Sequence, residues 1–100
     1  MPRCKQTIEI TNRQGLHARP ASLFVQMANR FRSKIVVRKG AEEVDGKSIM
    51  GLLMLALERG STVELTTDGP DAKEALEALA EFLMNHDEDL PGPRAVRGTP

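Results

Sequence analysis

The chain has 100 residues, the size of one ordinary domain, and its 14 basic and 14 acidic residues give a formal net charge of zero. This balance argues against a nucleic-acid binder, which usually carries a basic excess, and the absence of Trp and Tyr argues against base-stacking platforms. A domain of this size buries a single core and has little room for a deep substrate cavity, so its chemistry is expected at the surface.

The first elements are predicted to be a strand and a helix. Polar and apolar residues alternate from Lys5 to Thr11, which predicts a half-buried strand. Residues 12–15 (Asn-Arg-Gln-Gly) are typical of a turn. A helix is expected from about Ala18 to Arg30, because Pro20 suits a first helical turn and apolar residues then recur at helical spacing.

A hairpin and a second helix follow. β-branched residues predict a strand over Lys34–Arg38, and Glu42–Val44 is expected to be the short second arm of a hairpin. Ser48 is placed to open a helix that runs to about Leu57 and is ended by Arg59-Gly60.

The last elements are predicted to be a strand, a helix and a tail. Thr62–Thr67 alternates again, and Asp68–Asp71 has the proline and acidic residues of a helix start. The apolar stripe of this final helix consists of Ala72, Leu76, Leu79, Ala80 and Leu83. We expect one domain over residues 1–86 and a disordered tail over 87–100, where proline, glycine and charge replace apolar side chains.

The predicted order is strand, helix, strand, strand, helix, strand, helix. Helices on one face of a mostly antiparallel sheet would make an α+β sandwich. A ferredoxin-like split βαβ arrangement is the competing prediction, and the third helix argues against its plainest form.

His17 lies between the first predicted turn and the first predicted helix. The first turn of a helix exposes unpaired backbone N–H groups and partial positive charge, which favour anions. Arg19 adds a guanidinium whose geometry suits phosphate oxygens. The ordinary pKa of histidine is about 6.5, so a neutral ring with a nucleophilic nitrogen exists at neutral pH. We therefore hypothesise that His17 takes up a phosphoryl group, which Arg19 and the helix amides then hold.

A plainer interpretation makes His17 a surface turn residue and Arg19 a solvated helix residue. His-x-Arg alone is a weak motif, so the choice depends on the longer run Gly15–Ala21 and its place before a helix.

Ser48 is predicted to cap the second helix, with its hydroxyl accepting a backbone N–H. A phosphate on that hydroxyl would be tolerated by the helix dipole and would place about two negative charges beside an apolar surface. A capping role and a regulatory phosphorylation are therefore compatible.

The second predicted helix is unusually apolar. Its core side is expected to comprise Leu52, Leu55 and Leu57, so that Ile49, Met50 and Leu53 would point away from the core. Either the helix is buried on most sides, or the outward residues form a patch that docks other proteins. We favour the patch, because a domain this small has few ways to bury every side of a helix.

No metal site or cofactor is predicted. Cys4 and His86 lie far apart in the sequence and lack ligand spacing, so we place Cys4 at a strand end and His86 on the last helix. A single cysteine, no signal-peptide pattern and no long apolar stretch predict a cytoplasmic protein without membrane insertion.

Two motifs of this chain are Thr11–Ala21 (Thr-Asn-Arg-Gln-Gly-Leu-His-Ala-Arg-Pro-Ala) and Gly46–Leu52 (Gly-Lys-Ser-Ile-Met-Gly-Leu). Together they resemble the histidine phosphocarrier (HPr) family of the bacterial sugar phosphotransferase system. The resemblance covers the chain from Lys5 to Met84 and departs from the family in the longer tail and at Leu53, a position that is often less apolar.

The resemblance implies an open-faced β-sandwich, in which three helices cover one face of a four-stranded antiparallel sheet. His17 would accept a phosphoryl group on Nδ1 from phosphorylated Enzyme I, beside Arg19 and the backbone of Ala18, and pass it to sugar-specific IIA proteins. The chain would thus be a carrier without turnover of its own. Ser48 would be the site of HPr kinase/phosphorylase. The implied partner-docking residues are Leu16, Lys47, Ile49, Met50 and Leu53.

Two further functions are compatible with the same motifs. A carrier in a nitrogen-related or regulatory phosphorelay would keep the His17 motif, although the intact Gly46–Gly51 run favours a kinase-regulated carrier. The other is a binding module in which phospho-Ser48 helps to recruit a transcription regulator. A monomer is expected, because a carrier must present His17 to several partners.

Overall fold

The structure is a computed structural model that describes residues 3–11 and 15–85. Within these residues the elements are β1 (Arg3–Glu9), α1 (Ala18–Ala28), β2 (Lys34–Lys39), β3 (Glu42–Asp45), α2 (Ile49–Met54), β4 (Thr62–Asp68) and α3 (Ala72–Asn85). Residues 12–14 of the predicted turn, His86 and the predicted tail over 87–100 lie outside the described residues.

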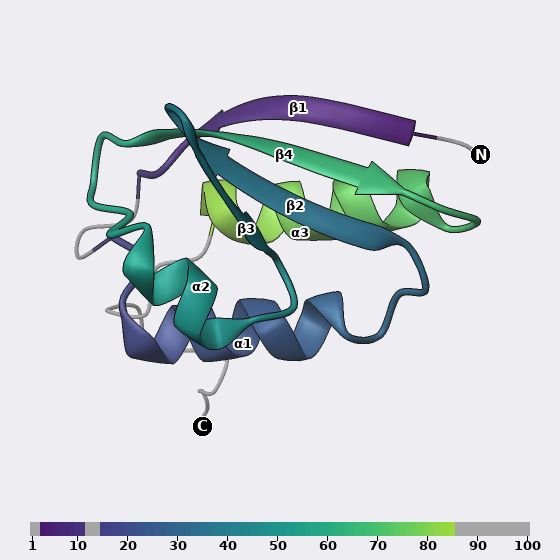
Figure 1. The fold of residues 1–100 in the computed structure, drawn as a ribbon, viewed down its shortest axis with the longest axis horizontal. Helices are drawn as coiled ribbons and strands as arrows, with labels where there is room; N and C mark the ends of the chain where they lie inside the picture. Colours follow the sequence, from purple (N-terminus) through teal and green to yellow (C-terminus); the bar gives the residue numbers. More distant parts are fainter. Residues whose placement is uncertain (1–2, 12–14, 86–100) are drawn as a thin grey trace, which may run out of the picture.

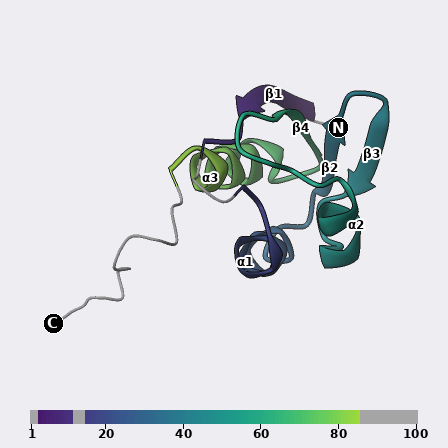
Figure 2. The same ribbon diagram turned by 90° about the vertical axis from the view of Figure 1, so that its left-hand side faces the viewer.

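The strands form one antiparallel sheet in the order β1-β4-β2-β3 (Figure 1). β4 pairs with β1 along its whole length and with β2 over Lys34–Arg38, so it lies between two strands that precede it in the chain. The described helices all lie on one side of the sheet (Figures 1 and 2). α3 packs on both β1 and β4. The architecture is the predicted open-faced α+β sandwich, with a third helix beyond the plainest ferredoxin-like arrangement.

The core lies between the sheet and the helices, because strand alternation turns every second side chain toward them. The strands contribute Ile8, Ile35, Val37, Val63 and Leu65, and the helices contribute Phe24, Ala28, Leu52, Leu79 and Leu83. Thr67 is a buried polar residue of β4, and its hydroxyl donates to the Ala72 carbonyl at 2.7 Å. That hydrogen bond offsets the cost of burying the hydroxyl.

The first strand spans Arg3–Glu9 rather than the predicted Lys5–Thr11. Ile10 does not pair with a residue of β4. Its backbone instead binds the turn that precedes β4 in the chain. The Ile10 N–H donates to the Ser61 carbonyl, and the Gly60 N–H donates to the Ile10 carbonyl, each at 2.8 Å. This turn, which the alternating pattern does not reveal, ends the strand.

The second helix ends earlier than predicted. α2 stops at Met54, and Arg59-Gly60 does not end it. The reason is Ala56, whose φ of 53° is left-handed and breaks the helix two residues after its last position. The chain then turns so that Leu55 and Leu57 are both buried, as predicted.

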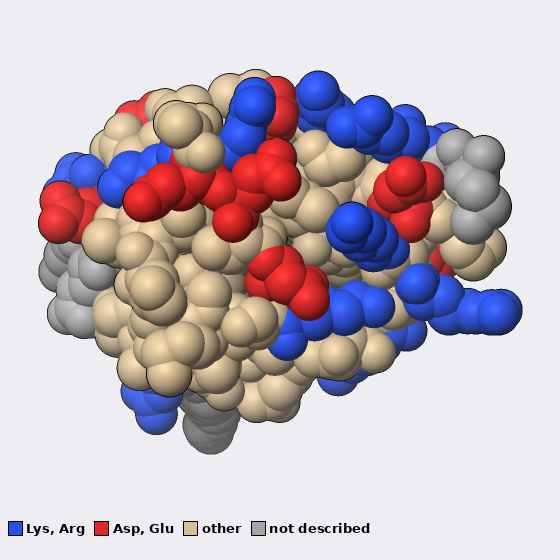
Figure 3. All heavy atoms as spheres, in the orientation of Figure 1, with Lys and Arg blue, Asp and Glu red and all other residues tan. Residues whose placement is uncertain are grey.

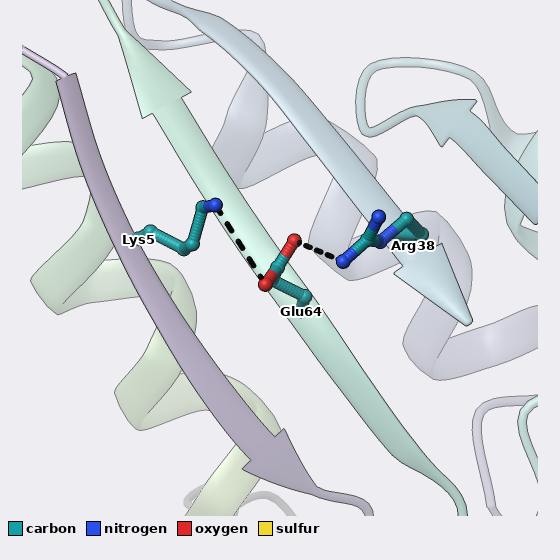
Figure 4. A network of polar contacts seen from close by, with 3 residues as sticks. All are labelled: Lys5, Arg38 and Glu64. Atoms are coloured by element: carbon teal, nitrogen blue, oxygen red, sulfur yellow. Dashed lines mark ion pairs between the residues drawn. The ribbon is translucent and has the colours of Figure 1, made fainter. Parts of the chain in front are cut away.

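The open face of the sheet is polar. Glu64 on β4 forms ion pairs with Arg38 of β2 at 2.9 Å and with Lys5 of β1 at 3.8 Å (Figure 4). These side chains link neighbouring strands across the open face. Because they are partly exposed, each pair is expected to contribute less than about 1 kcal/mol to stability.

Asp71 joins the start of α3 to the loop that precedes β2. Its carboxylate accepts the Ser33 hydroxyl at 2.6 Å and the backbone N–H groups of Arg32 and Ser33, each at 2.9 Å. These hydrogen bonds favour the charged carboxylate, with the Ser33 hydroxyl having the largest effect, and they lower the pKa of Asp71 from 3.8 to about 2.

Asp71→Asn is expected to lower the thermal unfolding midpoint by several degrees near neutral pH. Because the pKa of Asp71 is lower in the folded chain, its charge stabilises the fold fully above about pH 4 and progressively less as the pH falls to about 2. The difference from wild type should therefore shrink across that window in melts followed by circular dichroism. Asp68→Asn, at an exposed residue of β4, should change the midpoint little. A difference that stays constant down to about pH 2 would contradict this assignment.

Candidate phosphoryl-acceptor site

His17 lies at the N-cap of α1. Its backbone is extended, and its carbonyl accepts the first helical hydrogen bond, from the Ala21 N–H at 2.9 Å. The N–H groups of Ala18 and Arg19 precede that bond, and Pro20 has no N–H. Two backbone donors at the start of α1 are thus not used by the helix, and an anion beside His17 would meet them together with the positive end of the helix dipole.

The ring of His17 is half-buried, and its Nε2 atom is buried. Ala18 and Arg19 are both exposed beside it. Neighbours in the sequence thus supply an imidazole, two helix amides and a guanidinium at the start of α1, and their joint role in holding a phosphoryl group stays a prediction.

Gly15 and Leu16 hold the His17 segment against the turn that follows α2. The Leu16 N–H donates to the Leu57 carbonyl at 2.7 Å. Gly15 is buried with φ 71°, and a Cβ at this position would lie 2.5 Å from the carbonyl oxygen of Leu57. Both the left-handed backbone and this close approach require glycine immediately before Leu16 and His17.

A shallow hollow lies between the start of α1 and the end of α2. It is lined by Leu16, His17, Ala18, Leu53, Ala56, Leu57 and Glu58. The tertiary structure thereby brings the His17 motif and the apolar second helix, which are about thirty residues apart, to one place on the surface.

Beside the hollow, α2 exposes an apolar surface, which we call the α2 surface and define as Ile49, Met50, Leu53 and Met54. Ile49 and Leu53 are each 39% exposed, Met50 is 65% exposed and Met54 is 74% exposed. Figure 3 shows uncharged atoms over this helix, with acidic side chains along one border. The predicted outward side of α2 is confirmed. Met54 was missed, although its place one turn after Met50 was the available signal.

Two residues of the implied docking set are less exposed than the α2 surface. Leu16 is only 5% exposed and packs in the core, although it also lines the hollow beside His17, and its docking role stays a prediction. Lys47 is half-buried, and its ammonium donates to the Phe31 carbonyl at 2.8 Å. This bond ties the residue before Ser48 to the segment that follows α1.

Ser48 caps α2, as predicted. Its side-chain oxygen accepts the Gly51 N–H at 3.0 Å. A Cβ at Gly51 would lie 3.0 Å from the Cβ of Val44, so glycine allows the helix to approach β3 closely. The cap fixes the Ser48 hydroxyl at the border of the α2 surface.

Ser48→Ala is expected to lower the free energy of unfolding by about 1 kcal/mol, because the Gly51 N–H loses its acceptor. Urea denaturation followed by circular dichroism would measure the loss as a lower midpoint at unchanged slope. Ser22→Ala, inside α1, is the matched control, and its effect should stay within about 0.5 kcal/mol. Equal losses in the two variants would contradict the capping role.

Other kinds of site find no support among the described residues. No group of three His, Cys, Asp or Glu side chains is arranged there to hold a metal ion, and Cys4 is a half-buried residue of β1. None of the described helices combines the length and the apolar character needed to cross a membrane.

Known proteins share both the sequence and the fold. Residues 4–85 match the family model described as "PTS HPr component phosphorylation site". The phosphocarrier protein HPr of Neisseria meningitidis is 51% identical over 82 residues, which cover 82% of this chain and 92% of that protein. The HPr-like protein Crh of Halalkalibacterium halodurans is 51% identical over 79 residues, which cover 79% of this chain and 94% of that protein.

A solved structure gives the same relationship in three dimensions. The crystal structure of the phosphocarrier protein HPr from Bacillus anthracis matches with a TM-score of 0.81 at 45% identity, covering 84% of this chain and 100% of that chain. On its sequence, its fold and the position of His17, this chain belongs to the HPr family of phosphocarrier proteins of the phosphotransferase system.

Proposed function

We propose that this chain accepts a phosphoryl group on His17 from phosphorylated Enzyme I and passes it to IIA proteins of a sugar phosphotransferase system. The observation that carries the proposal is the position of His17 at the N-cap of α1, on the rim of the hollow that leads to the α2 surface. Membership of the HPr family supports the general class of partner. The chain would act in the cytoplasm and as a monomer.

The nucleophile in this proposal is Nδ1 of the neutral His17 ring. The burial of Nε2 supports this choice of ring nitrogen. Its lone pair forms the new N–P bond while the bond between phosphorus and the donor breaks, and delivery to the acceptor reverses this exchange. The phosphoryl oxygens would be held by the N–H groups of Ala18 and Arg19 and by the Arg19 guanidinium.

Docking is assigned to the α2 surface. An open hollow does not exclude water, so the protein partner must cover the phosphoryl group during transfer. Leu53 lines that hollow, and Ile49 and Met50 on the same helix also expose apolar side chains, which are typical of the centre of an interface. Lys47 would support docking indirectly, by holding the start of α2.

The experiment is to incubate the purified chain with phosphoenolpyruvate and Enzyme I and to analyse the phosphate bound to it. Acid-labile, base-stable phosphate is expected, and a purified sugar-specific IIA protein should discharge it. Discharge only by a IIA protein of a nitrogen-related branch would move the chain to that phosphorelay. Failure to take up any phosphate from phosphorylated Enzyme I would overturn the carrier proposal.

A second function is favoured by the likeness to the HPr-like protein Crh and by the place of Ser48. We propose that HPr kinase/phosphorylase phosphorylates Ser48 and that the phosphorylated chain helps to recruit a transcription regulator. The phosphate would be stabilised by the positive end of the α2 dipole and would add negative charge beside Ile49 and Met50. Kinase and ATP should give acid-stable phosphate on the wild type and none on Ser48→Ala. Labelling of both proteins would exclude Ser48 as the site.

A further inference from the structure

We propose that Lys39 is a positioning residue for the His17 site. Its ammonium holds the left-handed turn at Ala56, and that turn supports the segment that presents His17. The proposal rests on the carrier function of His17 and adds to it a residue on the sheet, outside both sequence motifs.

Lys39 lies on the inner face of β2. Strand alternation gives it the same side as Ile35 and Val37, which are both buried against the helices. Lys39 is half-buried, and its Nζ donates to the carbonyls of Leu55 at 3.3 Å and Ala56 at 3.1 Å. A cation is favoured at the last carbonyls of a helix, and these two acceptors offset the desolvation of the ammonium.

Lys39 binds the carbonyl of a residue, Ala56, whose backbone conformation is unfavourable. Ala56 has φ 53°, and among the described residues it is the only non-glycine residue with a positive φ. Side chains disfavour this region, so such a residue persists only where surrounding contacts hold it. The Lys39 ammonium supplies one of these contacts directly at the Ala56 carbonyl.

The held turn forms a wall of the His17 hollow. Ala56 and Leu57 line the hollow together with His17, and the Leu57 carbonyl accepts the Leu16 N–H at 2.7 Å. Few contacts therefore connect Lys39 to His17. The ammonium binds the Ala56 carbonyl, the next carbonyl along the chain is that of Leu57, and this carbonyl accepts the N–H of the residue before His17. Release of the turn would shift Leu16 and, with it, the imidazole.

The test uses Lys39→Met, which keeps an unbranched apolar side chain and removes the charge. The single-turnover rate of phosphoryl transfer from phosphorylated Enzyme I is expected to fall about tenfold, because a small displacement of a nucleophile has a large effect on rate. Lys39→Arg should restore most of the rate. Lys34→Met, on the same strand but exposed, is the matched control and should stay within about twofold of wild type. All rates are measured well below the unfolding midpoint of each variant.

A second arm asks whether Lys39 acts through Ala56. Glycine adopts a left-handed backbone without strain, so in the A56G background K39M should lower the rate only about two- to threefold. A tenfold loss in both backgrounds, or a K39M rate within about twofold of wild type, would overturn the proposal.

A third arm separates this proposal from the carrier function. Without Enzyme I, the NMR signals of the Leu16 amide and the His17 ring should shift in K39M and not in K34M. If the wild type takes no label from Enzyme I, the carrier function fails, and the NMR comparison still decides the role of Lys39. If the wild type is labelled and K39M leaves both signals unmoved, Lys39 does not position His17 and the carrier function stands.

Discussion

His17→Ala is expected to lower the rate of phosphate uptake from phosphorylated Enzyme I by at least about a thousandfold, because the variant lacks the nucleophilic nitrogen. Acid-labile phosphate, detected by intact mass before and after mild acid treatment, should be present on the wild type and absent from the variant. The loss should occur without unfolding, which circular dichroism would verify.

The sequence supplies a matched control for this experiment. It contains two histidines, and the second, His86, follows the last described helix. His86→Ala should take up phosphate at the wild-type rate. Phosphate that persists on His17→Ala, or that disappears from His86→Ala, would contradict the assignment of His17.

Phe24→Ala is expected to lower the free energy of unfolding by about 3–5 kcal/mol. Phe24 is completely buried on α1 and packs edge-to-face against Phe82 of α3, with ring centroids 6.2 Å apart. Its removal leaves a cavity where two helices meet the core. Since domains of this size are stable by only about 5–15 kcal/mol, this loss would remove a large share of the stability of the fold.

Chemical denaturation followed by circular dichroism would measure this loss. Leu23→Ala is the control, because Leu23 is the preceding residue of the same helix and is 40% exposed. Its loss should be below about 1 kcal/mol, since little apolar surface returns to water. Similar losses of unfolding free energy in Phe24→Ala and Leu23→Ala would contradict the role of Phe24 as a main packing residue of the core.

Much of the site was predictable because its signals are local. The N-cap position of His17 depends on a turn and on Pro20 within a few residues, and the capping role of Ser48 depends on the helix that it opens. The alternation of β4 and the apolar stripe of α3 likewise follow from periodicity. For the same reason, the outward side of α2 could be read from the spacing of Ile49, Met50 and Leu53.

Other features were decided by residues far apart in the chain. Leu16 is in the core because of its bond to Leu57, and α2 ends at Met54 because the chain turns at Ala56, where Lys39 binds its carbonyl. No local pattern distinguishes Ala56 from a helical alanine, and no strand pattern predicts an inward lysine at the end of β2.

By itself, then, the sequence determined the kinds of element, their order and the phosphoryl-acceptor motif, because each depends on the intrinsic preferences of neighbouring residues. The tertiary structure decided where those elements end and what surrounds His17. It brought α2 against the start of α1, and it placed the carbonyls of Leu55, Ala56 and Leu57 within reach of Lys39 and Leu16. Such contacts depend on how the core packs, because only packing brings donors and acceptors from distant segments within bonding distance.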